Sequence, residues 1–166
     1  RPPDRLRTAT STKAGRVERE GYHIDKLVLH TDSSTPLPAL TYHPVDPHDA
    51  AYLYVHDGGK AADGQLGGPI EDLVRQGYVV VSVDLRGQGE TARDAPDALA
   101  SDWKTFFLAY LLGQSVVAPH AEDILFAHQW VANYESQQPR EVHLVAVGQT
   151  AVAALHAAAL NPDLFS

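Results

Sequence analysis

The chain has 166 residues, of which 44% are hydrophobic, so a single compact domain with a real core is within reach. It carries 13 basic and 21 acidic residues, and the formal net charge of −8 argues against a general nucleic-acid-binding protein. Without cysteine it has no disulfides and no thiol catalysis, and no apolar run approaches the roughly 20 residues that span a bilayer.

The N-terminal part of the chain predicts a lead-in followed by a hairpin. Residues 1–20 hold proline, threonine and charges but few apolar side chains, so we expect a mobile segment there. Residues 21–30 predict a strand with apolar side chains on both faces, and residues 37–43 can return antiparallel after a turn cluster. Pro38 favours a position for this hairpin at the border of a sheet.

The rest of the chain alternates between short apolar runs and helical patterns. Strands are predicted over residues 51–55, 78–83 and 142–147, and helices over residues 69–76, 97–112, 118–134 and 150–160. This alternation is typical of a parallel sheet covered on both faces. The predicted fold class is α/β: a mostly parallel sheet flanked by helices, with an N-terminal antiparallel hairpin, in one domain over residues 21–166.

Glycine-bearing loops follow each of the three predicted parallel strands, at residues 56–60, 86–91 and 148–150. Right-handed crossovers bring the carboxyl ends of parallel strands to one edge of the sheet. Ligands of open α/β sheets bind at that edge, so we expect the functional site there.

Three sequences at these loops resemble those of a known family. Y-V-H-D-G-G-K, V-D-L-R-G-Q-G-E-T and V-G-Q-T-A-V-A-A-L-H-A-A-A-L are similar to segments of α/β-hydrolases, above all acetylxylan-esterase-like carbohydrate esterases. The resemblance covers residues 21–165 and implies the N-terminal part of such a fold, incomplete at its C-terminus. It implies acyl transfer to water, an ester or carbohydrate ligand and no cofactor. The family's frequent export suggests a secreted or periplasmic location, although no intact signal peptide precedes residue 17.

By the same resemblance, the loop after the first parallel strand supplies an oxyanion donor. The family uses a backbone N–H there, and in this chain it is that of Asp57 or Gly58. The second donor is the N–H of Ala151.

The R-G-Q-G loop is interpreted as structural. The resemblance implies that Arg86 ties loops together behind the site, pairing with Asp84 or with a carboxylate elsewhere. Gly87 and Gly89 permit the turn.

Thr150 stands where the family's nucleophile motif Gly-x-Ser-x-Gly has its serine, and Val152 replaces the second glycine. A β-branched side chain fits a strained, positive-φ turn poorly. Threonine can serve as a nucleophile if a base reaches it. The pattern favours a relaxed joint without a nucleophile over an active one.

The remaining triad members are missing from the sequence. In this fold the acid and the base follow the nucleophile, but only His156 and Asp163 do so here, and both are badly placed. The nine histidines form no metal-binding motif, so no metal is expected. The expected partners are an ester or carbohydrate, or a missing C-terminal half or companion chain, and neither nucleic acid nor membrane. The rival function is a non-catalytic pseudo-hydrolase that binds carbohydrate or a protein.

Overall fold

The computed structural model describes residues 10–30, 35–92, 107, 109–111, 113, 115, 117–135 and 138–166. The elements in chain order are β1 (Thr10–Arg19), β2 (Tyr22–His30), β3 (Pro36–Pro44), β4 (Ala51–His56), α1 (Pro69–Arg75), β5 (Val79–Val83), the 3-10 turn η1 (Gly89–Thr91), α3 (Ala118–Asn133), β6 (Val142–Val147) and α4 (Thr150–Leu160). The predicted helix over residues 97–112 lies largely outside the described residues.

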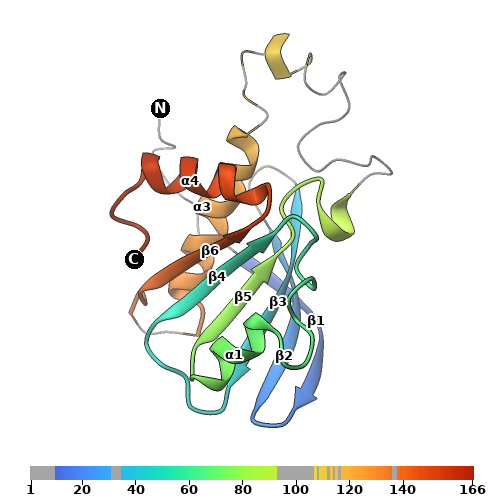
Figure 1. Cartoon of the computed structure of the whole chain (residues 1–166), viewed down its shortest axis with the longest axis vertical. Coiled ribbons are helices and arrows are strands. Elements are labelled where there is room, and N and C mark those ends of the chain that lie inside the picture. The colour runs from blue at the N-terminus through green and yellow to red at the C-terminus, as the bar shows by residue number, and fades with distance from the viewer. Residues whose placement is uncertain are drawn as a thin grey trace.

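The strands form one mixed sheet in the order β1-β2-β3-β5-β4-β6 (Figure 1). β4 pairs in parallel with β5 and with β6, while the three pairings from β1 through β3 to β5 are antiparallel. The predicted α/β class, with helices flanking the sheet and an N-terminal antiparallel hairpin, is confirmed; the sheet is mixed, and its parallel part is confined to β4, β5 and β6. Their arrowheads point to the same edge in Figure 1, where the predicted site lies.

Two predictions about the N-terminal part were wrong. Residues 10–19 are not a mobile lead-in but strand β1, which pairs with β2 through a two-residue turn at Glu20 and Gly21. The strand is almost wholly exposed, so it lacks the apolar alternation by which strands are recognised in a sequence. Because β1 forms the border of the sheet, the β2–β3 hairpin lies inside it.

Pro38 is tolerated inside the sheet because it lies where the hydrogen-bond ladder between β3 and β5 ends. The β3–β5 pairing begins at Ala39, and the Pro38 carbonyl accepts the N–H of Asp84 at 2.9 Å, just past the last paired residue. The N and the C=O of a strand residue point the same way, so the missing N–H of Pro38 also lies beyond the paired region.

An ionic cluster joins the exposed strand β1 to β2. Asp25 is almost wholly buried, and its carboxylate accepts hydrogen bonds from Arg16 Nε at 2.6 Å and from Lys13 Nζ at 2.8 Å. The bonds from Arg16 and Lys13 outweigh the burial of the carboxylate and lower the pKa of Asp25 to about 2.

Asp25→Asn is therefore expected to lower the free energy of unfolding by roughly 1.5–3 kcal/mol at about pH 7. The folded pKa of Asp25 lies below its ordinary value of 3.8, so its contribution is complete above that value and is lost as pH falls through about 2. Urea unfolding of both proteins at neutral and acidic pH measures the difference.

Glu18→Gln is the matched control for Asp25→Asn. Glu18 lies on β1, the strand of Arg16, and its side chain is 74% exposed and approaches Arg16 only to 4.0 Å. Its loss should change stability by less than about 1 kcal/mol. A gap between wild type and Asp25→Asn that persisted at about pH 2 would contradict the assignment.

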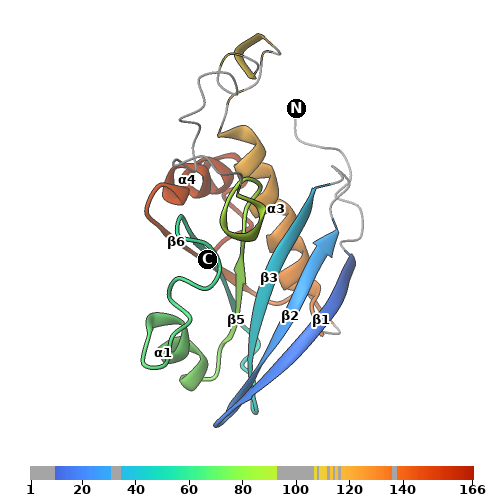
Figure 2. The same ribbon diagram turned by 90° about the vertical axis from the view of Figure 1, so that its right-hand side faces the viewer.

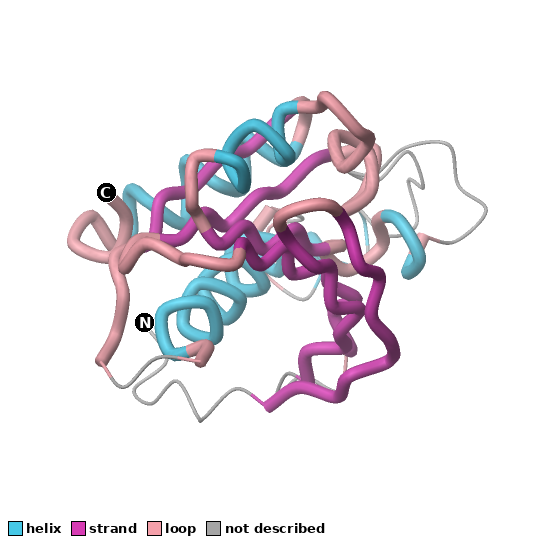
Figure 3. Tube along the Cα trace, turned by 90° about the horizontal axis from the view of Figure 1, so that it is seen from below, coloured by secondary structure: helices cyan, strands magenta, loops and turns pink. Residues whose placement is uncertain are grey.

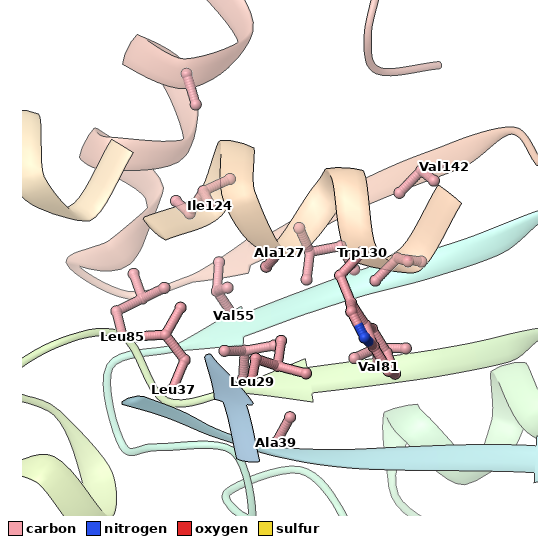
Figure 4. Packing of buried hydrophobic residues seen from close by; sticks show 14 of the residues in the cluster. Leu29, Leu37, Ala39, Val55, Val81, Leu85, Ile124, Ala127, Trp130 and Val142 are labelled. Carbon is pink, nitrogen blue, oxygen red and sulfur yellow. The ribbon is translucent and has the colours of Figure 1, made fainter. Parts of the chain in front are cut away.

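Side chains of the sheet are buried on both faces, and helices cover each face (Figures 2 and 3). On one face Ile124, Ala127 and Trp130 of α3 pack over residues of the sheet that include Val55 and Val81 (Figure 4). On the other face Ile70 and Val74 of α1 pack with the cluster Tyr22, Ile24, Tyr42, Tyr54 and Val80. None of the helices in the described ranges is long and apolar enough to cross a membrane.

Candidate active-site edge

The loops after β4, β5 and β6 meet at one edge of the sheet. The N–H of Asp57, after β4, donates to the carbonyl of Val147 at the end of β6 at 3.3 Å. The Asp57 carboxylate accepts the N–H of Gln149 at 2.9 Å. Lys60 joins the β4 loop to the β5 loop through Asp84. The structure therefore brings the three predicted loops into direct contact.

Thr150 is the first residue of α4, and its side chain lies beneath the loop edge. The residue is 1% exposed. Its hydroxyl donates to the carbonyl of Val147 at 2.7 Å, with the carbonyl of Val55 at 3.3 Å. A hydroxyl has one proton to donate, so the closer carbonyl of β6 is the main acceptor. The Thr150 oxygen thus faces the carbonyls of two strands.

Each of the three predicted oxyanion donors is engaged within the protein. The N–H of Asp57 donates to Val147, and the N–H of Gly58 donates to the imidazole Nδ1 of His56 at 2.8 Å. The N–H of Ala151 donates to the carbonyl of Gly148 at 3.2 Å, as part of the turn into α4. A carbonyl oxygen of a ligand would have to displace these bonds to use the donors.

The contact that sequence reasoning missed joins the Asp57 carboxylate to the Gln149 N–H. The two residues are 92 positions apart, and no spacing rule links them. The sequence predicted a role for the backbone N–H of Asp57. In the structure the Asp57 carboxylate accepts the N–H of Gln149, the residue just before α4. Only the pairing of β4 with β6 brings the two loops together.

The imidazole of His56 lies close to the carboxylates of Asp57 and Asp63 at this edge. Its Nδ1 accepts the Gly58 N–H, so in the neutral ring the proton is on Nε2, which lies 3.8 Å from Asp63. Asp63 accepts the hydroxyl of Tyr54 at 2.6 Å. Burial and this bond together raise the pKa of Tyr54. No group of three or more histidines and carboxylates in the described part of the chain could hold a metal ion.

The predicted structural loop is held by a buried ion cluster around Asp84. Lys60 is 7% exposed, and its ammonium donates to Asp84 and to Glu90, each at 2.7 Å. Burial disfavours the Lys60 charge, but the two hydrogen bonds outweigh it and raise the pKa of Lys60. Gly89 has φ +49°, and a Cβ on it would overlap the Asp84 carboxylate.

Arg86 joins the same loop to α3. Its guanidinium donates to the buried carboxylate of Asp123 at 2.9 and 2.5 Å, and its carbonyl lies 2.8 Å from the imidazole Nε2 of His120. Of the two partners that the sequence left open for Arg86, the structure has the carboxylate elsewhere, on α3. Gly87, with φ +76°, allows the turn that follows Arg86.

The two residues after Thr150 that could serve as base and acid lie away from it. The His156 imidazole bonds to the carbonyl of Val152 at 2.8 Å, one turn earlier on α4. Asp163 lies exposed in the turn that follows α4. The Thr150 hydroxyl instead faces the carbonyls of Val147 and Val55.

The chain is similar in structure to several esterases. It matches a Bacteroides fragilis protein assigned as an acetyl xylan esterase with a TM-score of 0.70 and 18% identity, over 92% of this chain and 45% of that one. It matches an acetyl xylan esterase of Paenibacillus with a TM-score of 0.63 and 22% identity, over 93% and 50%. A methylesterase matches with a TM-score of 0.67 and 18% identity, over 94% and 33%.

No protein-family model matches the sequence, and no curated protein is similar to it at the level of sequence. At these identities the structural likeness establishes the fold, which is of the α/β-hydrolase type found in acetyl xylan esterases and related esterases. The chain spans about half the length of these two acetyl xylan esterases.

Proposed function

We propose that this chain is an acetylxylan-esterase-like α/β-hydrolase module that has no working nucleophile and uses its loop edge for binding. The observation that carries the proposal is the position of the Thr150 hydroxyl. A nucleophile must present its oxygen to the substrate and pass its proton to a base. The hydroxyl of Thr150 is buried and donates to the carbonyl of Val147, which is a poor base.

The occupied N–H groups support the same proposal. Hydrolysis of an ester needs donors aimed at the oxygen on which negative charge develops. The N–H groups of Asp57, Gly58 and Ala151 already have acceptors inside the protein. An edge with engaged donors and a buried hydroxyl supports binding better than turnover.

The ligand that we propose is a carbohydrate. Carboxylates and imidazoles hydrogen-bond sugar hydroxyls, and the partly exposed side chains of His56, Asp57 and Asp63 supply such groups at the edge. The similar structures include two acetyl xylan esterases, which favours acetylated xylan as the first carbohydrate to test. The esterase fold also favours a second candidate, weak carboxylic-ester hydrolysis through Thr150.

Hydrolysis of a small aryl acetate distinguishes the two candidates. Wild type, Thr150→Ala and Thr150→Ser are expected to hydrolyse it equally, at a rate near that of buffer, because the Thr150 hydroxyl is buried against the carbonyl of Val147 and the predicted N–H donors are engaged within the protein. Release of the chromogenic alcohol is the measurement. A loss of tenfold or more in Thr150→Ala, about 1.4 kcal/mol of transition-state stabilisation, would contradict the proposal and favour the esterase.

Binding is measured separately from turnover. Retention of the protein on acetylated xylan, without release of acetate, is expected if the edge binds carbohydrate. The same polymer after chemical deacetylation serves as the control for recognition of the acetyl groups. Absence of retention on both polymers would contradict a carbohydrate ligand and leave a protein partner as the occupant to seek.

A further inference from the structure

The left-handed residue of the turn between β6 and α4 is Gly148, two positions before Thr150. Gly148 has φ +72°, whereas Gln149 has helical φ and ψ of −67° and −23°. In a nucleophile elbow the reactive side chain stands on the strained residue of the turn itself. By this geometry the place belongs to Gly148, whereas the resemblance in sequence assigned it to Thr150. The small residues two positions to either side are then Ala146 and Thr150.

The space above Gly148 is filled by the Asp57 carboxylate. A Cβ built on Gly148 would overlap the carboxyl group of Asp57, which contributes its three nearest atoms. The same carboxylate accepts the N–H of Gln149 at 2.9 Å. That N–H is the first after the turn residue, where an elbow has its oxyanion donor. Negative charge is also stabilised at the N-terminus of a helix, here α4.

We infer that the Asp57 carboxylate fills the space in which the nucleophile of an elbow would stand and accepts the Gln149 N–H that an elbow would offer to an oxyanion. We call this space the anion position. The inference deepens the proposed function and rests on it for the role of the edge. It also restricts the ligand. A substrate carboxylate or oxyanion would meet the Asp57 charge and an occupied donor, so the intact edge accepts neutral or cationic groups. Removal of the carboxylate opens a place for a small carboxylate such as acetate.

The filling of space is tested by Gly148→Ala against Gly67→Ala. Gly67 also has φ +72°, but a Cβ built on it meets nothing within 4 Å, so it isolates the cost of the left-handed backbone. Gly67→Ala is expected to lower Tm by about 2–8 °C. Gly148→Ala is expected to lower Tm further than Gly67→Ala does, because its Cβ also displaces the Asp57 carboxylate from the Gln149 N–H.

Asp57→Ala supplies the double-mutant cycle. In that background, Gly148→Ala is expected to lower Tm no further than Gly67→Ala does in wild type. A carboxylate that only caps α4 would leave the two substitutions independent. Equal losses for Gly148→Ala and Gly67→Ala, or additive losses in the cycle, would overturn the inference.

Occupancy of the anion position is tested by the amide resonance of Gln149. In Asp57→Ala, sodium acetate is expected to move this resonance back toward its wild-type position and to saturate, whereas sodium chloride at equal ionic strength is not. Wild type, with its position already filled, should not respond. No response in Asp57→Ala, or the same response in both proteins, would overturn the inference. Neither the stability cycle nor the amide resonance measures turnover. Hydrolysis that depends on Thr150 would therefore contradict the proposed function without changing the result of either experiment on Asp57.

Discussion

Lys60→Met is expected to lower the free energy of unfolding by about 3–5 kcal/mol, because it leaves the buried Asp84 carboxylate without its cation. Asp84 is 1% exposed and, among the described residues, would keep the N–H groups of Lys60 and Glu90, at 2.6 and 3.0 Å. Methionine is similar to lysine in length, so the loss reports the charge more than the packing. Chemical unfolding monitored by circular dichroism measures it.

The control for Lys60→Met is Glu90→Gln, in the same cluster. Glu90 accepts a bond from the same ammonium at 2.7 Å, but its side chain is 72% exposed. Its neutralisation is expected to cost less than about 1 kcal/mol. Similar losses for the two substitutions would show that the Lys60–Asp84 pair is not the bond that holds the β4 and β5 loops together.

Leu53→Ala is expected to lower the free energy of unfolding by about 2–5 kcal/mol through the cavity that it leaves. Leu53 is wholly buried in the middle of β4, opposite Val81 of β5 and Leu144 of β6. Because β4 carries the loop that contains Asp57, its loss of packing acts on the strand that positions the site. Unfolding by urea is the measurement, as for the charge variants.

Leu155→Ala is the matched control, with the same change of side chain at a surface position. Leu155 lies on α4 and is 70% exposed, so its truncation should change stability by no more than about 0.5 kcal/mol. A comparable loss at Leu155 would mean that the exposed side of α4 is covered in solution, and would contradict its position at the surface.

The parts of the fold that were predictable are those with strong local patterns. A short apolar run, typical of a strand buried on both faces, is formed by Val79, Val80, Val81 and Val83. The helix α1 begins at Pro69 and is followed by a left-handed glycine, as helix signals require. By contrast, strand β1 was not predicted. It is exposed and is joined to β2 by ion pairs with Asp25, so its sequence lacks the apolar alternation that indicates a strand.

The candidate site was predictable in its place but not in its contacts. The glycine-bearing loops, with Asp57, Asp84, Arg86 and Thr150, all follow strands of the sheet, so their common edge follows from chain order and handedness. Which groups meet there does not. Lys60 was not among the predicted site residues, yet it is the partner of Asp84, while Arg86 reaches across to α3.

The sequence by itself determined the α/β class, the three parallel strands and the edge at which their loops converge, because each depends on local periodicity and on general rules of handedness. The order of these strands in the sheet, β5-β4-β6, was decided by the tertiary structure. Only the tertiary structure decided that the Thr150 hydroxyl points to the carbonyls of β4 and β6, that Gly148 takes the left-handed turn, and that Asp57 holds the N–H of Gln149. These contacts depend on distances between residues far apart in the chain and on rotamers chosen by packing, and no local pattern encodes either.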